Sequence, residues 1–237
     1  MVSVNFQKIE RNADLMKFLG RIDIRVPERT KGRTTDHTET WSICRLLATL
    51  QSASILSYPI SLAHRDRPDF AIDAGNSSIG VEVTESIPQQ LAEISALAER
   101  EFPNALIEMP MFGQSAPKRS VAELRRMLES TRLTSDGWAG DQPEREWAFF
   151  IRKTIETKIE RFWKDGFSKF DTNWLLIYDN LPFDIHDLNA ALRYLHNYMQ
   201  GINVCFNRIY IEHERSIIEI EGASWKSYAI NDLWQNR

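Results

Sequence analysis

The chain has 237 residues, of which 43% are hydrophobic and 26% are charged, and its formal net charge is −4. These values are ordinary for a globular protein and exclude a disordered or collagen-like chain. No apolar run reaches the roughly 18 residues that a transmembrane helix needs. The first residues lack a secretory signal pattern, and Cys44 and Cys205 are too few for a disulfide framework. We therefore expect a single cytoplasmic domain over residues 1–237, without a membrane partner.

The charge is distributed unevenly along the chain. Residues 1–67 hold 11 Lys and Arg against 7 Asp and Glu, a local charge of +4, whereas the remainder holds 18 against 26. A basic segment of this kind is typical of proteins that bind polyanions such as nucleic acids. A solvated basic arm has the same composition, so both interpretations stay open.

Periodicity and capping residues predict the elements of the first half of the chain. Asp36 and Glu39 have the spacing of a capping box, which predicts a helix from Asp36 to about Gln51. The residues before that helix are expected to be irregular or extended. Alternation of polar and apolar residues, with turn residues between the runs, predicts strands over 21–26, 55–58, 70–72 and 79–84.

Helices and strands alternate in the rest of the chain. Helical periodicity predicts helices over 89–101, 121–129, 144–164 and 184–199. Apolar runs predict strands over 173–179, 204–212 and 217–221. Such alternation is typical of an α/β fold with a mixed central β-sheet flanked by helices. Four tryptophans fall at positions that predict core packing rather than base stacking: Trp41, Trp147, Trp163 and Trp174.

A hairpin is predicted around the dipeptide Gly75-Asn76, which suits a tight two-residue turn. With the turn at this position, the side chains alternate between two faces. One face is apolar and is formed by Phe70, Ile72, Ile79 and Val81. The other face carries Asp69 opposite Glu82.

Two carboxylates opposite each other on neighbouring strands lie about 5 Å apart at Cβ, and their repulsion destabilises the sheet. A divalent cation such as Mg²⁺ or Mn²⁺ removes this repulsion, because hard cations bind carboxylate oxygens. A cation held in this way activates water and neutralises charge on a phosphodiester. Asp69 and Glu82 are therefore candidate metal ligands. The alternative is that both acids lie on a solvated face of the sheet.

The residues around this acid pair resemble the PD-(D/E)XK nuclease superfamily. The resemblance rests on Pro68-Asp69, on the thirteen-residue step to Glu82, and on the strand that ends in Glu82-Val83-Thr84. It implies a restriction-endonuclease-like core of one helix, a three-stranded meander, a second helix and a further strand. This core covers residues 36 to about 180, with a helical insertion at about 86–143. The resemblance also implies a Mg²⁺- or Mn²⁺-dependent endonuclease with DNA as its partner, and it allows a homodimer.

The sequence departs from the motif at Thr84, where the superfamily has a lysine that supports the attacking water. Some members take this lysine from the following helix. That relationship makes Lys158 the first candidate and Lys153 the second. The alternative for Lys158 is a surface lysine that lays its apolar stem along the helix.

Further site residues follow from the same resemblance. Glu39, on the first helix, corresponds to an additional metal ligand, although a capping box with Asp36 explains it equally well. The backbone carbonyl of Val83 is a further possible ligand because it lies between Glu82 and Thr84. Glu85 either reaches the site or caps the next helix, and Thr84 itself is a possible site residue.

The leading hypothesis is a metal-dependent nuclease that hydrolyses phosphodiester bonds of DNA, with Asp69 and Glu82 holding the metal and Lys158 supplying positive charge. The alternative is a catalytically inactive nuclease-fold module that binds DNA or protein, which Thr84 and the acidic net charge favour. A third interpretation is an α/β protein unrelated to nucleases. It holds if Asp69 and Glu82 lie far apart or on opposite faces.

Overall fold

A computed structural model describes residues 4–28, 31–105, 107, 109–130, 137–231 and 233–234. The chain divides into two compact units. The first unit consists of Met1–Glu85, Thr157–Asp179 and Asn203–Arg237, and the second of Ser86–Glu156 and Asn180–Ile202.

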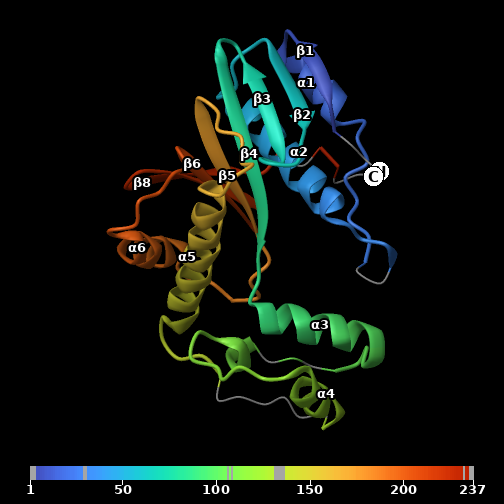
Figure 1. The fold of residues 1–237 in the computed structure, drawn as a ribbon, viewed down its shortest axis with the longest axis vertical. Coiled ribbons are helices and arrows are strands. Elements are labelled where there is room, and N and C mark those ends of the chain that lie inside the picture. Colours follow the sequence, from blue (N-terminus) through green and yellow to red (C-terminus); the bar gives the residue numbers. More distant parts are fainter. Residues whose placement is uncertain are drawn as a thin grey trace. The chain divides into compact units, whose positions relative to one another are not determined.

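The sheet of the described residues has eight strands, which follow one another in chain order (Figure 1). Strands β5 and β6 pair in parallel, whereas β1–β2, β2–β3, β3–β4, β6–β7 and β7–β8 are antiparallel. The predicted mixed α/β class is therefore confirmed. The strands are β1 Phe6–Ile9, β2 Ile60–His64, β3 Phe70–Ala74, β4 Ser77–Ser86, β5 Thr172–Asp179, β6 Arg208–His213, β7 Ser216–Glu221 and β8 Ser224–Ala229.

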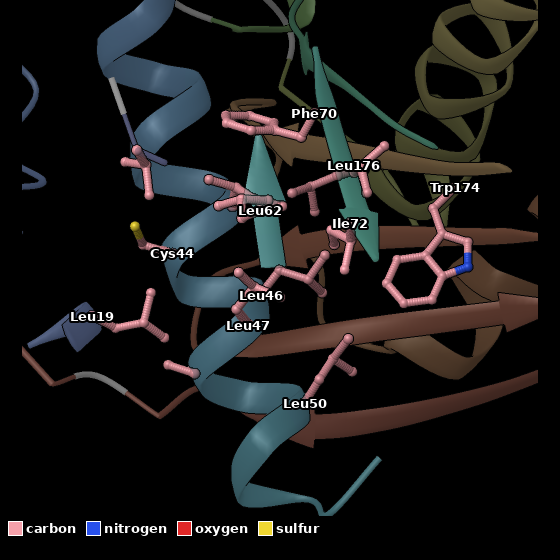
Figure 2. Close-up of a cluster of buried hydrophobic side chains, with 14 of the residues drawn as sticks. Leu19, Cys44, Leu46, Leu47, Leu50, Leu62, Phe70, Ile72, Trp174 and Leu176 are labelled. Atoms are coloured by element: carbon pink, nitrogen blue, oxygen red, sulfur yellow. The ribbon is translucent and has the colours of Figure 1, made fainter. Parts of the chain in front are cut away.

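The core of the first unit lies between this sheet and helix α2, Thr35–Ser52. The apolar face of α2 is fully buried, as its periodicity predicts, and consists of Ile43, Leu46, Leu47 and Leu50. Figure 2 shows its leucines beside Leu62, Phe70 and Ile72 of the neighbouring strands and beside Trp174 and Leu176 of β5. A second helix, α1 (Asn12–Leu19), adds Leu15 and Leu19 to the same core.

The predicted hairpin is formed by β3 and β4. Phe70 pairs with Val81 and Ile72 with Ile79, the register that the Gly75-Asn76 turn predicts. Gly75 has a φ of 62°, in the left-handed region where a residue without Cβ is unstrained. All four paired apolar residues are buried, so one face of the hairpin belongs to the core. The opposite face is left to carry Asp69 and Glu82.

The second unit is helical in its described part. Its core is formed by apolar residues of α3 and α4, among them Leu91, Ile94, Leu97, Leu124 and Leu128. The segment 86–143, expected as an insertion, lies wholly in this unit together with 144–156 and 180–202. The elements are α3 Gln89–Glu101, the short 3₁₀ helix η2 Met109–Phe112, α4 Val121–Glu129, the part of α5 (Gln142–Phe162) up to Glu156, and α6 Leu188–Met199.

Several predicted elements differ from the structure. Residues 21–26 form no strand; their alternation reflects Ile24, which is buried in the core without strand pairing. Residues 55–58 are also irregular, and β2 begins at Ile60. The edge strand β8 was not predicted, because its residues are mostly exposed and show no apolar alternation. Trp163, expected in the core, is 58% exposed. No helix of the described chain is long and apolar enough to cross a membrane.

Candidate functional site

A cavity of about 540 Å³ lies in the first unit, where the last residues of β4 meet the β2–β3 loop, α2 and the C-terminal turn of α5. Every residue that lines it belongs to the first unit. The sequence candidates among its lining residues are Glu39, Asp69, Glu82, Val83, Thr84, Glu85 and Lys158. Residues from three separate stretches of the chain are thus brought together.

Lys153, the second candidate lysine, does not line this cavity. It belongs to the second unit, where its Nζ lies 3.0 Å from Glu156 Oε2 and its side chain is 54% exposed. Because Lys158 lines the cavity and Lys153 does not, only the first candidate has the position that the resemblance implies.

Asp69 is fixed beside β4 by a backbone hydrogen bond. The Val83 N–H donates to Asp69 Oδ2 at 2.7 Å. Burial and the nearby charge of Glu82 raise the pKa of Asp69 to about 7, although the hydrogen bond from Val83 opposes this shift. The two acids therefore lie close enough to repel each other, and they face one cavity. Asp69 and Glu82 therefore lie neither far apart nor on opposite faces.

Glu82 and Lys158 form a buried ion pair. Lys158 Nζ donates to Glu82 Oε1 at 2.6 Å and to the backbone carbonyl of Val83 at 3.2 Å. Glu82 is 7% exposed and Lys158 is 8% exposed. The alternative interpretation of Lys158 as a surface lysine is wrong, because its ammonium group lies inside the cavity wall, bonded to one of the candidate ligands.

The second carboxylate oxygen of Glu82 has no hydrogen-bond partner among the described residues, although it is buried. A buried polar atom without a partner costs free energy, on the order of 1–3 kcal/mol and more when it is charged. Glu82 Oε2 thus has the property expected of an oxygen that binds a cation or a water molecule.

Glu39 contacts a histidine that the sequence did not associate with it. Glu39 Oε2 lies 3.0 Å from His64 Nε2, and the side chain of His64, on β2, is 22% exposed. The alternative role of Glu39, a capping box with Asp36, is wrong. The residue before α2 is Thr34, whose N–H donates to His37 Nδ1 at 3.2 Å. Glu39 is therefore available to the cavity.

One oxygen or nitrogen atom from each of Asp36, Glu39 and His64 lies within 4.8 Å of the others, an arrangement that is compatible with a metal ion. His64 is the last residue of β2. Glu39 and His64 are 25 positions apart in the sequence, so no local sequence pattern predicts their contact.

Cations at the cavity were also missed. Arg67, Arg161 and Lys164 all line it. Arg161 follows Lys158 by three residues, a spacing that places both side chains on one helix face and that could have identified it. Glu85 lines the cavity too, and its Oε1 lies 3.7 Å from Arg33. Glu85 does not cap α3, because Pro88 precedes that helix without a side-chain cap.

Comparison with known proteins assigns no relative: no family model, no curated protein and no solved structure matches the chain. A function must therefore follow from the chemistry of the cavity.

Proposed function

We propose that the protein is a metal-dependent nuclease that hydrolyses phosphodiester bonds, with DNA as the expected substrate. The observation that supports this most strongly is the cavity in which Asp69 and Glu82 lie together beside Lys158. The order of the elements around it is consistent with a restriction-endonuclease-like core. In this assignment α2 is the first helix, β2, β3 and β4 are the meander, α5 is the second helix and β5 is the further strand.

The donor set fits a hard divalent cation such as Mg²⁺ or Mn²⁺. Asp69 and Glu82 offer carboxylate oxygens, Glu82 Oε2 lacks another partner, and Val83 offers a backbone carbonyl. The raised pKa of Asp69, caused by burial and by the Glu82 charge, indicates negative charge that a cation would neutralise. Such an ion, when bound, supplies an activated water and neutralises charge on the phosphodiester.

Lys158 supplies the positive charge that Thr84 cannot provide. Its ammonium group has three N–H bonds, of which two donate to Glu82 and to the Val83 carbonyl. The third remains for a phosphate oxygen or for the attacking water. Because the lysine is fixed by two bonds in a site of low dielectric, its charge is preorganised for a reaction in which negative charge increases.

The competing function is a binding module that retains the fold without hydrolysis. It is favoured by the Lys158–Glu82 bond, which already neutralises one of the two acids without any ion. A nuclease cleaves DNA and a binding module does not, so one experiment separates the two functions.

The experiment measures cleavage of single-stranded, supercoiled and linear duplex DNA in Mg²⁺, in Mn²⁺ and in EDTA. We expect cleavage by the wild type with either metal and none by Asp69→Ala or Glu82→Gln. Asp73→Ala is the matched control, because Asp73 is an exposed aspartate on β3, the strand that follows Asp69, but lies outside the cavity, and this variant should cleave like the wild type. A folded wild type that binds Mn²⁺ by calorimetry but cleaves no substrate would instead establish the binding module.

A further inference from the structure

An exposed tryptophan lies next to two cations of the cavity. Trp163, the residue after α5, is 58% exposed, as is Val121 in the second unit. Arg161 and Lys164 line the cavity on either side of Trp163 in the sequence. Exposure of a large aromatic side chain to water costs free energy. An exposed aromatic residue beside a charged site is therefore typical of a binding surface.

The indole ring is held in place by its neighbours. Lys169 Nζ lies 4.4 Å from the centre of the Trp163 ring, and the ring of Phe162 meets it edge-on at a centroid distance of 5.2 Å. Phe162 is itself buried. A ring fixed on these sides, with more than half of its surface free, can stack on a flat partner without first losing side-chain freedom.

The loop that follows Trp163 is tied to the loop that carries Arg67. The Ser168 N–H donates to the Arg67 carbonyl at 3.2 Å, and Arg65 Nη2 donates to Ser168 Oγ at 3.3 Å. The backbone of Arg67 and the segment 161–169 are thereby joined at the edge of the cavity. We call residues 65–67 and 161–169 together the basic edge.

The basic edge is positively charged within an acidic protein. It holds five basic side chains, Arg65, Arg67, Arg161, Lys164 and Lys169, against two acids, Asp66 and Asp165, a net charge of +3 in a chain of net charge −4. Arg161 and Lys164 form no ion pair with any described residue. Unpaired cations beside an exposed aromatic ring are the combination with which proteins bind nucleic acid strands, the cations contacting phosphates and the ring a base.

We propose that Trp163 stacks on an unpaired base of a single-stranded nucleic acid, whose backbone follows Arg67, Arg161 and Lys164 into the cavity. Single strands fit better than duplexes because the faces of a base inside a duplex are already covered by its neighbours. The proposal rests on the proposed function for the choice of nucleic acid as ligand. It narrows the substrate to single strands and to the unpaired ends or flaps of duplexes.

Binding can be measured without cleavage, by fluorescence anisotropy of a labelled 12-nucleotide single strand and of a blunt duplex of the same sequence, in Ca²⁺ and without Mg²⁺ or Mn²⁺. Trp163→Ala should weaken single-strand binding about tenfold, and Trp163→Phe should retain most of the affinity because its ring still stacks. Duplex binding should change little. Val121→Ala is the matched control, since it shortens an equally exposed apolar side chain in the other unit and should have no effect.

The same titrations identify the atoms involved. A single strand without bases should bind the wild type about as weakly as the normal strand binds Trp163→Ala, and the two losses should not add, because both remove one stacking contact. Arg161→Ala and Lys164→Ala should each reduce the slope of log K against log salt concentration by about 0.7, whereas Trp163→Ala should leave the slope unchanged.

Three results would overturn the proposal. The first is Trp163→Ala with wild-type affinity for the single strand. The second is an equal loss for single strand and duplex. The third is a wild-type dimer that Trp163→Ala converts to a monomer in sedimentation, because Trp163 would then be covered by a second copy of the chain. The first of these results, in a wild type that cleaves DNA, would refute this proposal and leave the nuclease standing. Single-strand binding that depends on Trp163, without cleavage of any DNA, would refute the proposed nuclease function and leave the stacking proposal standing.

Discussion

Three side chains of the cavity depend on one another electrostatically. Lys158 neutralises Glu82 at 2.6 Å, Glu82 raises the pKa of Asp69, and the Val83 N–H holds Asp69 in place. Glu82 and Lys158 are almost completely buried, so neither charge can be compensated by solvent. In such a site the loss of one partner leaves a buried charge, which costs more than the pair itself contributes.

Replacing Lys158 by Met removes the positive charge but keeps most of the volume of the side chain. Because Glu82 then has a buried charge without its partner, we expect a loss of about 3–5 kcal/mol in the free energy of unfolding. The double variant Lys158→Met, Glu82→Gln should recover much of this loss, because it buries no unpaired charge. Urea denaturation in EDTA measures both effects. A Lys158→Met protein as stable as the wild type would contradict the buried ion pair.

The raised pKa of Asp69 makes the metal-free protein sensitive to pH. Because burial and the Glu82 charge raise the folded pKa to about 7, above its ordinary value of 3.8, the folded state holds a proton that the unfolded state releases. This contribution therefore lowers stability as pH rises from about 4 to 7. Bound Mn²⁺ favours the ionised form of Asp69 and so offsets this loss of stability. We therefore expect Mn²⁺ to raise Tm more at pH 8 than at pH 5.5. Asp69→Asn is the control, and an identical pH dependence in that variant would refute the assignment.

At the scale of the elements, the sequence predicts those features that local patterns encode. The turn at Gly75-Asn76 sets the register of β3 and β4. The apolar periodicity predicts helices that contain Glu39 and Lys158, and both residues lie in helices, α2 and α5. The contact between Glu39 and His64 was not predictable, because it depends on the packing of α2 beside β2. Neither was the burial of Lys158, since a lysine at the edge of an apolar stripe is exposed unless an acid faces it.

Gly80 of β4 provides a test of how the hairpin positions Asp69. A Cβ at this position would lie 2.6 Å from Phe170 Cδ2 and 2.9 Å from Pro68 Cγ, and Pro68 directly precedes Asp69. Gly80→Ala should therefore displace Pro68, destabilise the protein by about 1–3 kcal/mol and weaken Mn²⁺ binding. Gly75→Ala is the matched control, because its left-handed φ costs about 1–2 kcal/mol while its Cβ meets ordinary contacts. Calorimetry should show Mn²⁺ affinity reduced in Gly80→Ala alone.

At the scale of the whole molecule, one helix belongs to both units. Helix α5 contributes its residues up to Glu156 to the second unit and those from Thr157 onward to the first. Lys158 and Arg161 follow this division, so the cations of α5 that line the cavity lie in its final turns. All lining residues belong to the first unit, and a bound metal would therefore stabilise that unit directly.

Hydrogen exchange can test this division. Because a ligand stabilises the structure that binds it, Mn²⁺ should slow amide exchange in the first unit, most of all in residues 66–85 and 157–165, which contain most of the cavity lining. Exchange in α3 and α4 should stay unchanged, since neither helix contributes to the cavity. Asp69→Asn should abolish the Mn²⁺ effect, whereas Asp73→Ala should preserve it. Equal slowing in both units would mean that the ion acts on the whole chain, and slowing that persists in Asp69→Asn would place it at other ligands.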